Sequence, residues 1–151
     1  MIEEIKHQWS LDFPNPKEVI SNFTNLPQIT LQFENCYNKY HEYYYKASAE
    51  RMKLVKQKEK IEGVLRRYYS KRYIDEDTLS LYNLSPLQEN YTKAEIDSLV
   101  STHDMIMELD YRIHELEEVK SLTTDYLSFI KKWGYNLKNF IEIQKFKTGM
   151  I

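Results

Sequence analysis

Residues 33–72 read FENCYNKYHEYYYKASAERMKLVKQKEKIEGVLRRYYSKR. Apolar and aromatic side chains return in this segment at spacings of three and four residues, which is the repeat of a helix that packs along a partner helix. This seam consists of Phe33, Tyr37, Tyr40, Tyr44, Ala47, Leu54, Ile61, Leu65 and Tyr68. A helix of about 40 residues with such a seam is not stable without a partner. The sequence therefore predicts a long basic helix over 26–72 that pairs with a second long helix.

Two charged residues, Arg51 and Lys58, interrupt the seam. Polar residues at seam positions lower stability, but they can also fix the register and the number of packed helices. We interpret both residues as positions that fix the register and the number of packed helices.

The basic side chains form a stripe on the face of this helix that lies away from the seam. Its members recur every seven residues and are Lys39, Lys46, Lys53, Lys60 and Arg67. Successive members lie roughly 10 Å apart along the helix, a spacing suited to following a sugar–phosphate backbone without reading its bases. The rings of Tyr68 and Tyr69 close the segment and can stack on splayed bases. The predicted DNA-binding residues are Lys46, Lys53, Lys56, Lys60, Arg66, Arg67, Tyr68, Tyr69, Lys71 and Arg72.

The net charge of −2 conceals an uneven distribution. Residues 46–73 carry ten basic and three acidic side chains, a net charge of +7, whereas residues 74–130 carry three basic and thirteen acidic ones, a net charge of −10. A helix face that serves solubility alone usually mixes both signs, so the basic segment favours a polyanionic ligand. Two alternatives stay open: an ordinary solvated face, and neutralisation of the stripe by the acidic second helix.

The N-terminal segment, residues 1–25, predicts a short helix. Its side chains Ile5, Trp9 and Phe13 recur at four-residue spacing. Pro14 and Pro16 are expected to end this helix, because proline lacks the backbone N–H that a helix interior requires.

The second half of the chain predicts a loop and two more helices. Residues 73–91 lose the periodicity and gather serine, aspartate, asparagine and proline, so we expect a connecting loop. Thr92-Lys-Ala-Glu95 has the pattern of a capping box, which begins a second long helix over 92–132. Gly134 is expected to end that helix. A C-terminal helix over 135–148 then completes an all-α, single-domain fold.

The predicted C-terminal helix is too short to be stable alone. Its apolar side must dock on its own chain or on a neighbouring subunit, and we favour the neighbour. The predicted oligomerisation residues are Trp133, Leu137, Phe140, Ile141 and Phe146. We therefore expect a homo-oligomer.

The sequence offers little material for catalysis. His103, Asp110 and His114 are grouped on the second helix, but three ligands of mixed type are a weak indication of a metal site. Three glycines are too few for a phosphate-binding loop. Cys36 has only His41 near it in sequence and is interpreted as a small, partly buried side chain. We therefore predict a non-enzymatic protein with no metal and no cofactor.

The single cysteine excludes an internal disulfide and fits a reducing compartment. The first residues lack a basic start followed by an apolar stretch, so no secretory signal is expected. No apolar run approaches the roughly 20 residues that span a bilayer. The sequence thus predicts a soluble, cytoplasmic protein with no membrane partner.

The order of these features resembles the UvsY family of recombination mediators of T4-like phages. The resemblance covers nearly the whole chain. It includes the opening IEEIKHQWSLD at 2–12, the basic helix that ends in Tyr68 and Tyr69, the helix start TKAEI at 92–96, and the ending GYNLKNFIEIQKFKTG at 134–149, which is the most specific of these motifs.

The resemblance implies a homo-oligomer that binds single-stranded DNA and contacts the phage recombinase and the phage single-strand-binding protein. Its implied role is to load the former onto strands that the latter covers, in recombination, repair and replication. The resemblance also implies that the basic stretch before the tyrosine pair carries the DNA contacts and that the C-terminal helix drives assembly. This chain has Gly63 and Leu65 where the family pattern places lysine and arginine, although Lys60, Arg66 and Arg67 preserve the local charge.

Two functions of other classes fit parts of the sequence. A coiled-coil scaffold would oligomerise without retaining DNA. A peripheral membrane helix is disfavoured, because a seam of tyrosines interrupted by Arg51 and Lys58 makes a poor face for lipid.

Overall fold

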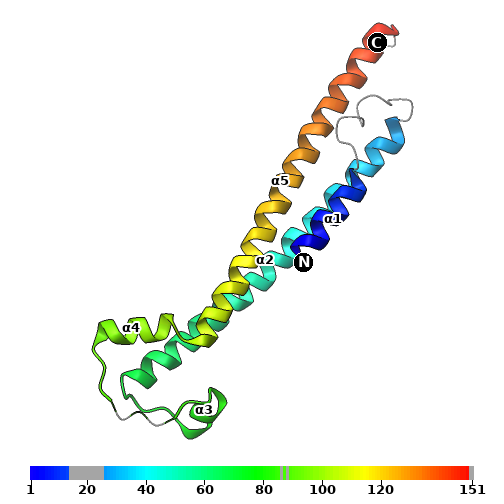
Figure 1. Ribbon diagram of the computed structural model, residues 1–151. Coiled ribbons are helices and arrows are strands. Elements are labelled where there is room, and N and C mark those ends of the chain that lie inside the picture. The colour runs from blue at the N-terminus through cyan, green and yellow to red at the C-terminus, as the bar shows by residue number, and fades with distance from the viewer. Residues whose placement is uncertain (14–25, 86, 88, 150–151) are drawn as a thin grey trace. The chain divides into compact units, whose positions relative to one another are not determined.

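A computed structural model describes residues 1–13, 26–85, 87 and 89–149. These residues form α1 (Ile2–Asp12), α2 (Leu26–Tyr69), α3 (Glu76–Leu81), α4 (Lys93–Ser101) and α5 (Asp104–Lys147), shown in Figure 1. No strand occurs among them. The predicted all-α class with two long packed helices is confirmed, and the predicted helix end at Pro14 and Pro16 lies outside the described residues.

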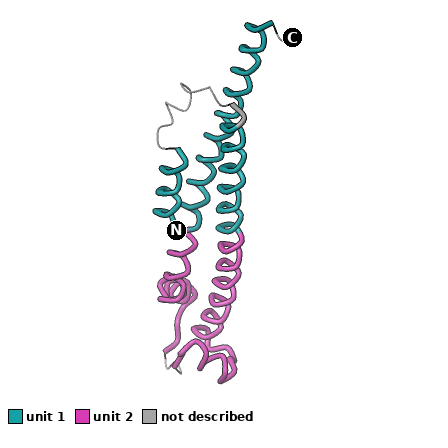
Figure 2. Tube along the Cα trace, turned by 90° about the vertical axis from the view of Figure 1, so that its right-hand side faces the viewer, with its two compact units in different colours: residues 1–48, 116–151 teal, residues 49–115 magenta. Residues whose placement is uncertain are grey.

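The chain groups into two compact units, which Figure 2 colours separately. Unit 1 comprises residues 1–48 and 116–151, and unit 2 comprises residues 49–115. Each of the long helices α2 and α5 has one part in unit 1 and the other part in unit 2. The single domain expected from the sequence stays a prediction.

Unit 1 packs α1 against the first part of α2 and the last part of α5 (Figure 1). The predicted seam lies at its centre, because Tyr40 and Ala47 are fully buried. Its buried side chains are Ile5, Phe13, Phe33, Cys36, Tyr40, Ala47, Leu116, Val119, Thr123, Leu127, Ile130 and Leu137. The short N-terminal helix predicted from Ile5, Trp9 and Phe13 is confirmed as α1.

The indole of Trp9 fixes α1 on both long helices. Its ring stacks on Tyr126 of α5 at a centroid distance of 3.9 Å and an interplanar angle of 7°. The same ring meets Tyr40 of α2 edge-on at 5.2 Å and Phe129 of α5 at 5.3 Å. Aromatic pairs at such distances add to the stabilisation from buried area. Trp9 is therefore the principal aromatic anchor of α1.

Asp12, at the end of α1, joins this helix to α2 through charge-assisted hydrogen bonds. Its Oδ2 accepts one from Lys39 Nζ at 2.8 Å and one from Tyr40 Oη at 2.9 Å, and its Oδ1 accepts a third from Gln8 Nε2 at 3.2 Å. Burial raises the pKa of Asp12, but these hydrogen bonds and the Lys39 ammonium outweigh burial and hold the pKa below its usual 3.8.

The Asp12 contacts predict a specific dependence of stability on pH. Because the folded-state pKa lies below that of the unfolded chain, the stabilisation is complete above about pH 4 and is lost as pH falls through the folded value. At pH 7 we expect Asp12→Asn to lower the free energy of unfolding by roughly 1–2 kcal/mol. Urea unfolding of both proteins between pH 7 and pH 3 should show this difference shrinking in acid. A difference that is constant with pH would contradict the role assigned to the carboxylate.

Unit 2 packs the remaining part of α2 against α4 and the first part of α5. Its buried side chains are Leu54, Ile61, Leu65, Val100, Ile106, Leu109 and Ile113. Lys58, which interrupts the predicted seam, is only partly exposed, and its Nζ lies 2.6 Å from Oδ1 of Asp110 on α5. A carboxylate on the partner helix thus accommodates a charge at a seam position.

The single helix predicted over 92–132 is wrong, because α4 ends at Ser101 and α5 begins at Asp104. The backbone N–H of Thr102 bonds to Ser98 O, which closes α4. Nδ1 of His103 then accepts a hydrogen bond from the N–H of Met105 at 3.4 Å, which satisfies one free donor at the start of α5. The predicted capping box is confirmed: Thr92 N donates to Glu95 Oε2 at 2.7 Å, and Thr92 Oγ1 accepts from Glu95 N at 3.4 Å.

The predicted end of a helix at Gly134 is also wrong, since α5 continues through this glycine to Lys147 and includes the predicted C-terminal helix. Glycine costs about 1 kcal/mol relative to alanine in a helix, but it keeps its backbone N–H. The buried side chains Ile130 and Leu137 on either side hold the helix in place. The packing of α5 in unit 1 therefore overrides the local preference of the glycine.

Two smaller differences concern the connection between the long helices. The predicted loop 73–91 contains α3, whose N-cap Asp75 accepts a hydrogen bond from the N–H of Thr78 at 2.8 Å. The long basic helix ends at Tyr69 rather than at residue 72. Lys71 there has a left-handed φ of 52°, and Arg72 N bonds back to Arg67 O at 3.0 Å, which is a regular helix C-terminal turn.

Candidate nucleic-acid interface

The part of α2 in unit 2 carries its apolar and basic side chains on different sides. Leu54, Ile61 and Leu65 are buried. At 100° per residue, the exposed side chains Lys53, Lys56, Lys60 and Arg67 fall within about 60° of one another and at least about 80° from these apolar residues. Burial of the seam in unit 2 therefore turns this basic face towards solvent.

Within the described part of the chain, five cations of the basic segment 46–73 are exposed and have no carboxylate partner. They are Lys53, Lys56, Lys60, Arg67 and Arg72, hereafter the open cations. No carboxylate oxygen of the described residues lies within 4.0 Å of their side-chain nitrogens. In unit 2, the predicted stripe therefore remains available to an external anion along its members Lys53, Lys60 and Arg67.

Other predicted stripe and site residues are engaged inside the chain. In unit 1, Lys39 Nζ lies 2.8 Å from Asp12 Oδ2, and Lys46 Nζ lies 2.6 Å from Glu42 Oε1 of the same helix. The Lys46 pair is exposed, and exposed pairs of this kind contribute about 0–1 kcal/mol. Lys46 therefore remains accessible to a competing anion, whereas Lys39 serves the junction with α1.

In unit 2, Arg66 forms an ion pair with Asp97 of α4. The guanidinium hydrogen bond holds the pKa of Asp97 below its usual range. Lys58 pairs with Asp110, as described above. Neutralisation of the basic segment by the acidic second half of the chain thus occurs at Lys58 and Arg66, whereas the open cations have no carboxylate partner in the part of the chain that the structure describes.

Tyr68 and Tyr69 are partly buried against the segment that follows α2. The hydroxyl of Tyr68 donates to Ser85 O, and the ring of Tyr69 meets Tyr91 edge-on at a centroid distance of 5.8 Å. Burial raises the pKa of both phenols. Each ring keeps part of its surface exposed, and base stacking on either ring stays a prediction.

A groove of about 450 Å³ lies where α2 ends and α4 begins, within unit 2. It is lined by Gly63, Arg66, Arg67, Ser70, Arg72, Lys93, Ile96 and Asp97. Lys93 and Asp97 were missed by the sequence analysis. Their four-residue spacing, counted from the capping box at Thr92, places both on one face of α4, but their approach to α2 is a tertiary contact that periodicity does not reveal.

A comparison with protein-family models decides which family this is. The model described as "Recombination, repair and ssDNA binding protein UvsY" matches residues 16–150. The chain belongs to the UvsY family. Searches of curated proteins and of solved structures gave no match. Membership implies recombination, repair and binding of single-stranded DNA, and UvsY is not a known enzyme family.

In this UvsY-family chain, the predicted oligomerisation residues lie on the last part of α5 and differ in exposure. Leu137 is buried, Trp133 and Ile141 are partly buried, and 74% of the surface of Phe146 is exposed. Phe140, the fifth residue, is also partly buried. Part of the apolar side is therefore used within unit 1, and its end remains uncovered in the single chain.

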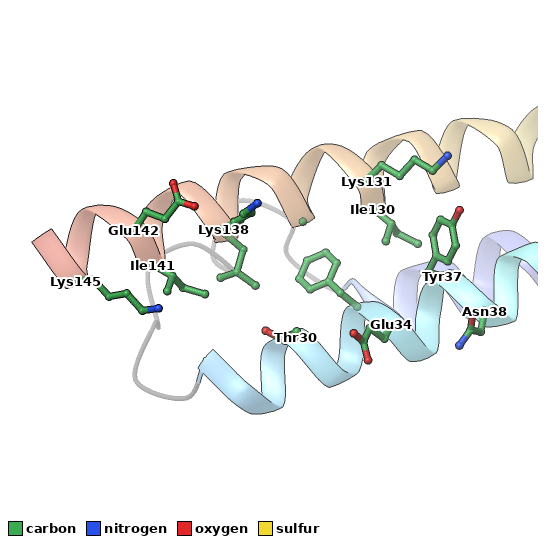
Figure 3. Close-up of a pocket in the computed structure, with 13 residues that line it drawn as sticks. Thr30, Glu34, Tyr37, Asn38, Ile130, Lys131, Lys138, Ile141, Glu142 and Lys145 are labelled. Atoms are coloured by element: carbon green, nitrogen blue, oxygen red, sulfur yellow. The ribbon is translucent and has the colours of Figure 1, made fainter. Parts of the chain in front are cut away.

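An apolar groove of about 620 Å³ runs between α2 and this part of α5. Figure 3 shows Ile130 and Ile141 of α5 directed towards the side of α2 that carries Thr30 and Glu34. The rim bears charged side chains, including Lys138. The groove combines an apolar floor with a polar edge.

Sites of other kinds receive little support from the described part of this UvsY-family chain. No group of three histidine, cysteine, aspartate or glutamate side chains within it is placed to hold a metal ion, His103, Asp110 and His114 included. Cys36 is buried, and burial raises the pKa of its thiol, which disfavours the reactive thiolate. None of the described helices combines the length and the apolar character needed to cross a membrane.

Proposed function

We propose that each copy of the protein holds single-stranded DNA by its sugar–phosphate backbone, through the open cations and Lys46. The observation that carries this proposal is the exposed basic face of α2, at which Lys53, Lys56, Lys60 and Arg67 have no carboxylate partner among the described residues. Lysine and arginine bind phosphate groups without regard to base identity. The expected binding is therefore sequence-independent and sensitive to salt.

Assembly of several copies multiplies this modest binding surface. The uncovered apolar end of α5, including Phe146, supports a contact between subunits there. Once one copy has bound a strand, its neighbours bind at a high effective concentration, which raises the overall affinity without any new type of contact. A homo-oligomer is therefore part of the proposal.

The proposed biological role is that of a recombination mediator. The assembled protein binds single strands that the phage single-strand-binding protein covers and helps load the phage recombinase onto them. Membership of the UvsY family supports this role, which requires no catalysis by the mediator and no cofactor. Its place of action is the cytoplasm of the host cell, where the phage DNA recombines, is repaired and replicates.

The affinity for oligothymidylate at several salt concentrations tests the DNA-binding part of the proposal. We expect the logarithm of the binding constant to fall linearly with the logarithm of salt concentration, with a slope of about −0.7 per neutralised phosphate. Engagement of the five open cations of one copy alone predicts a slope of roughly −3.5. Light scattering on the same samples reports assembly. An affinity that does not change with salt, or an oligomer that retains no DNA, would favour the scaffold function instead.

A further inference from the structure

The groove at the end of α2 differs in shape from the rest of the basic face. On the convex surface of a helix, each lysine meets a phosphate singly. In the groove, Arg66, Arg67, Arg72 and Lys93 line one concavity of about 450 Å³. Several donors can therefore reach the same anion, and arginine forms paired hydrogen bonds with phosphate oxygens.

One acidic side chain, Asp97, lies in this cationic groove and already occupies Arg66. Both side chains of the pair are about half exposed, with relative accessibilities of 50% for Arg66 and 48% for Asp97. A pair so exposed to water contributes little to stability and yields readily to another anion. A guanidinium has five N–H donors, so Arg66 can also engage an incoming phosphate as Asp97 withdraws.

We propose that a backbone phosphodiester of the bound strand enters this groove, takes Arg66 from Asp97, and is held there with the help of Lys93. This inference rests on the proposed function and adds three residues to it, the first of which is Arg66. Lys93 is a DNA-binding residue outside α2, and Asp97 is an internal competitor that lowers the affinity. The rest of the strand follows the open cations along α2, and the groove receives it at the C-terminal end of the helix.

Paired substitutions test the role of Asp97. Asp97→Asn is expected to raise the affinity for oligothymidylate roughly 5-fold, because it frees Arg66 and removes a repelling charge. Glu108→Gln is the matched control: it removes the same charge from an exposed side chain of unit 2 that has no ion-pair partner among the described residues. The control should change affinity less than about 2-fold. The gain from Asp97→Asn should largely disappear in an Arg66→Gln background, because there is then no arginine to release.

Lys93 is tested in the same assay. Lys93→Gln should lower the affinity roughly 5-fold, whereas Lys132→Gln, an equal charge change at an exposed position of α5, should lower it less than about 2-fold. Circular dichroism and thermal unfolding of each variant establish that it is folded. Lys93→Gln should lower the affinity for oligothymidylates with and without a 5′-phosphate by the same factor, because an internal phosphodiester occupies the groove. A response confined to the phosphorylated oligonucleotide would overturn the proposal in favour of a terminal phosphate.

The outcomes separate this inference from the function on which it rests. If the unaltered protein does not retain oligothymidylate, the proposed function fails. If it binds, but Asp97→Asn behaves like Glu108→Gln and Lys93→Gln behaves like Lys132→Gln, the function stands and the groove proposal is wrong.

Discussion

Simultaneous replacement of Lys53, Lys60 and Arg67 by glutamine should lower the affinity of the protein for oligothymidylate by roughly 100-fold at low salt. Each lost phosphate contact removes about 1 kcal/mol of binding free energy, and three such losses amount to about two powers of ten. The side chains are exposed and make no ion pair among the described residues, so their replacement should leave the fold intact. Fluorescence anisotropy with a labelled oligonucleotide measures the change.

The matched control removes three positive charges at another cationic part of the chain. Lys132, Lys138 and Lys147 are exposed on α5, and the control replaces them together by glutamine. Its net charge equals that of the α2 variant, so nonspecific attraction to DNA changes equally in both. We expect the control to lose less than about 5-fold in affinity. Equal losses in the two variants would mean that net charge, rather than the basic face of α2, determines binding.

The second large effect concerns the stability of unit 1. Trp9→Ala should lower the free energy of unfolding by roughly 2–4 kcal/mol, somewhat less than the cost of removing a fully buried aromatic side chain, because the indole is partly exposed. The indole stacks on Tyr126 and meets Tyr40 and Phe129 edge-on, so its loss leaves a cavity between α1 and both long helices. Urea unfolding followed by circular dichroism measures the loss.

Tyr111→Ala is the control for this substitution. Tyr111 also lies on a helix, but 66% of its surface is exposed. Truncation of an exposed aromatic ring should cost less than about 0.5 kcal/mol. If Trp9→Ala were as mild as Tyr111→Ala, the docking of α1 described here would be contradicted.

The sequence was sufficient to predict the features that depend on local periodicity. The spacing of Tyr40, Ala47, Leu54 and Ile61 indicated the seam, and all four side chains are buried. The capping box at Thr92 could also be predicted from the sequence, because its hydrogen bonds join residues three positions apart. Such signals depend on the geometry of one helix, which the order of residues determines directly.

The features that were predicted wrongly depend on contacts between segments. Gly134 does not end a helix, because the buried side chains around it keep α5 in place. The groove was missed for the same reason, since Arg66 and Asp97 are 31 positions apart. The charge sums correctly located the basic segment, but they could not separate the engaged cations Lys58 and Arg66 from the open ones.

Acetylation of lysine amines, with and without bound oligothymidylate, shows which lysines a bound strand covers. Mass spectrometry of the digested protein reports the modification of each lysine. We expect bound DNA to protect Lys53, Lys56 and Lys60, and to leave the modification of Lys132 and Lys147 unchanged. Protection of the two α5 lysines, with unaltered modification of the three on α2, would contradict the proposed binding through α2.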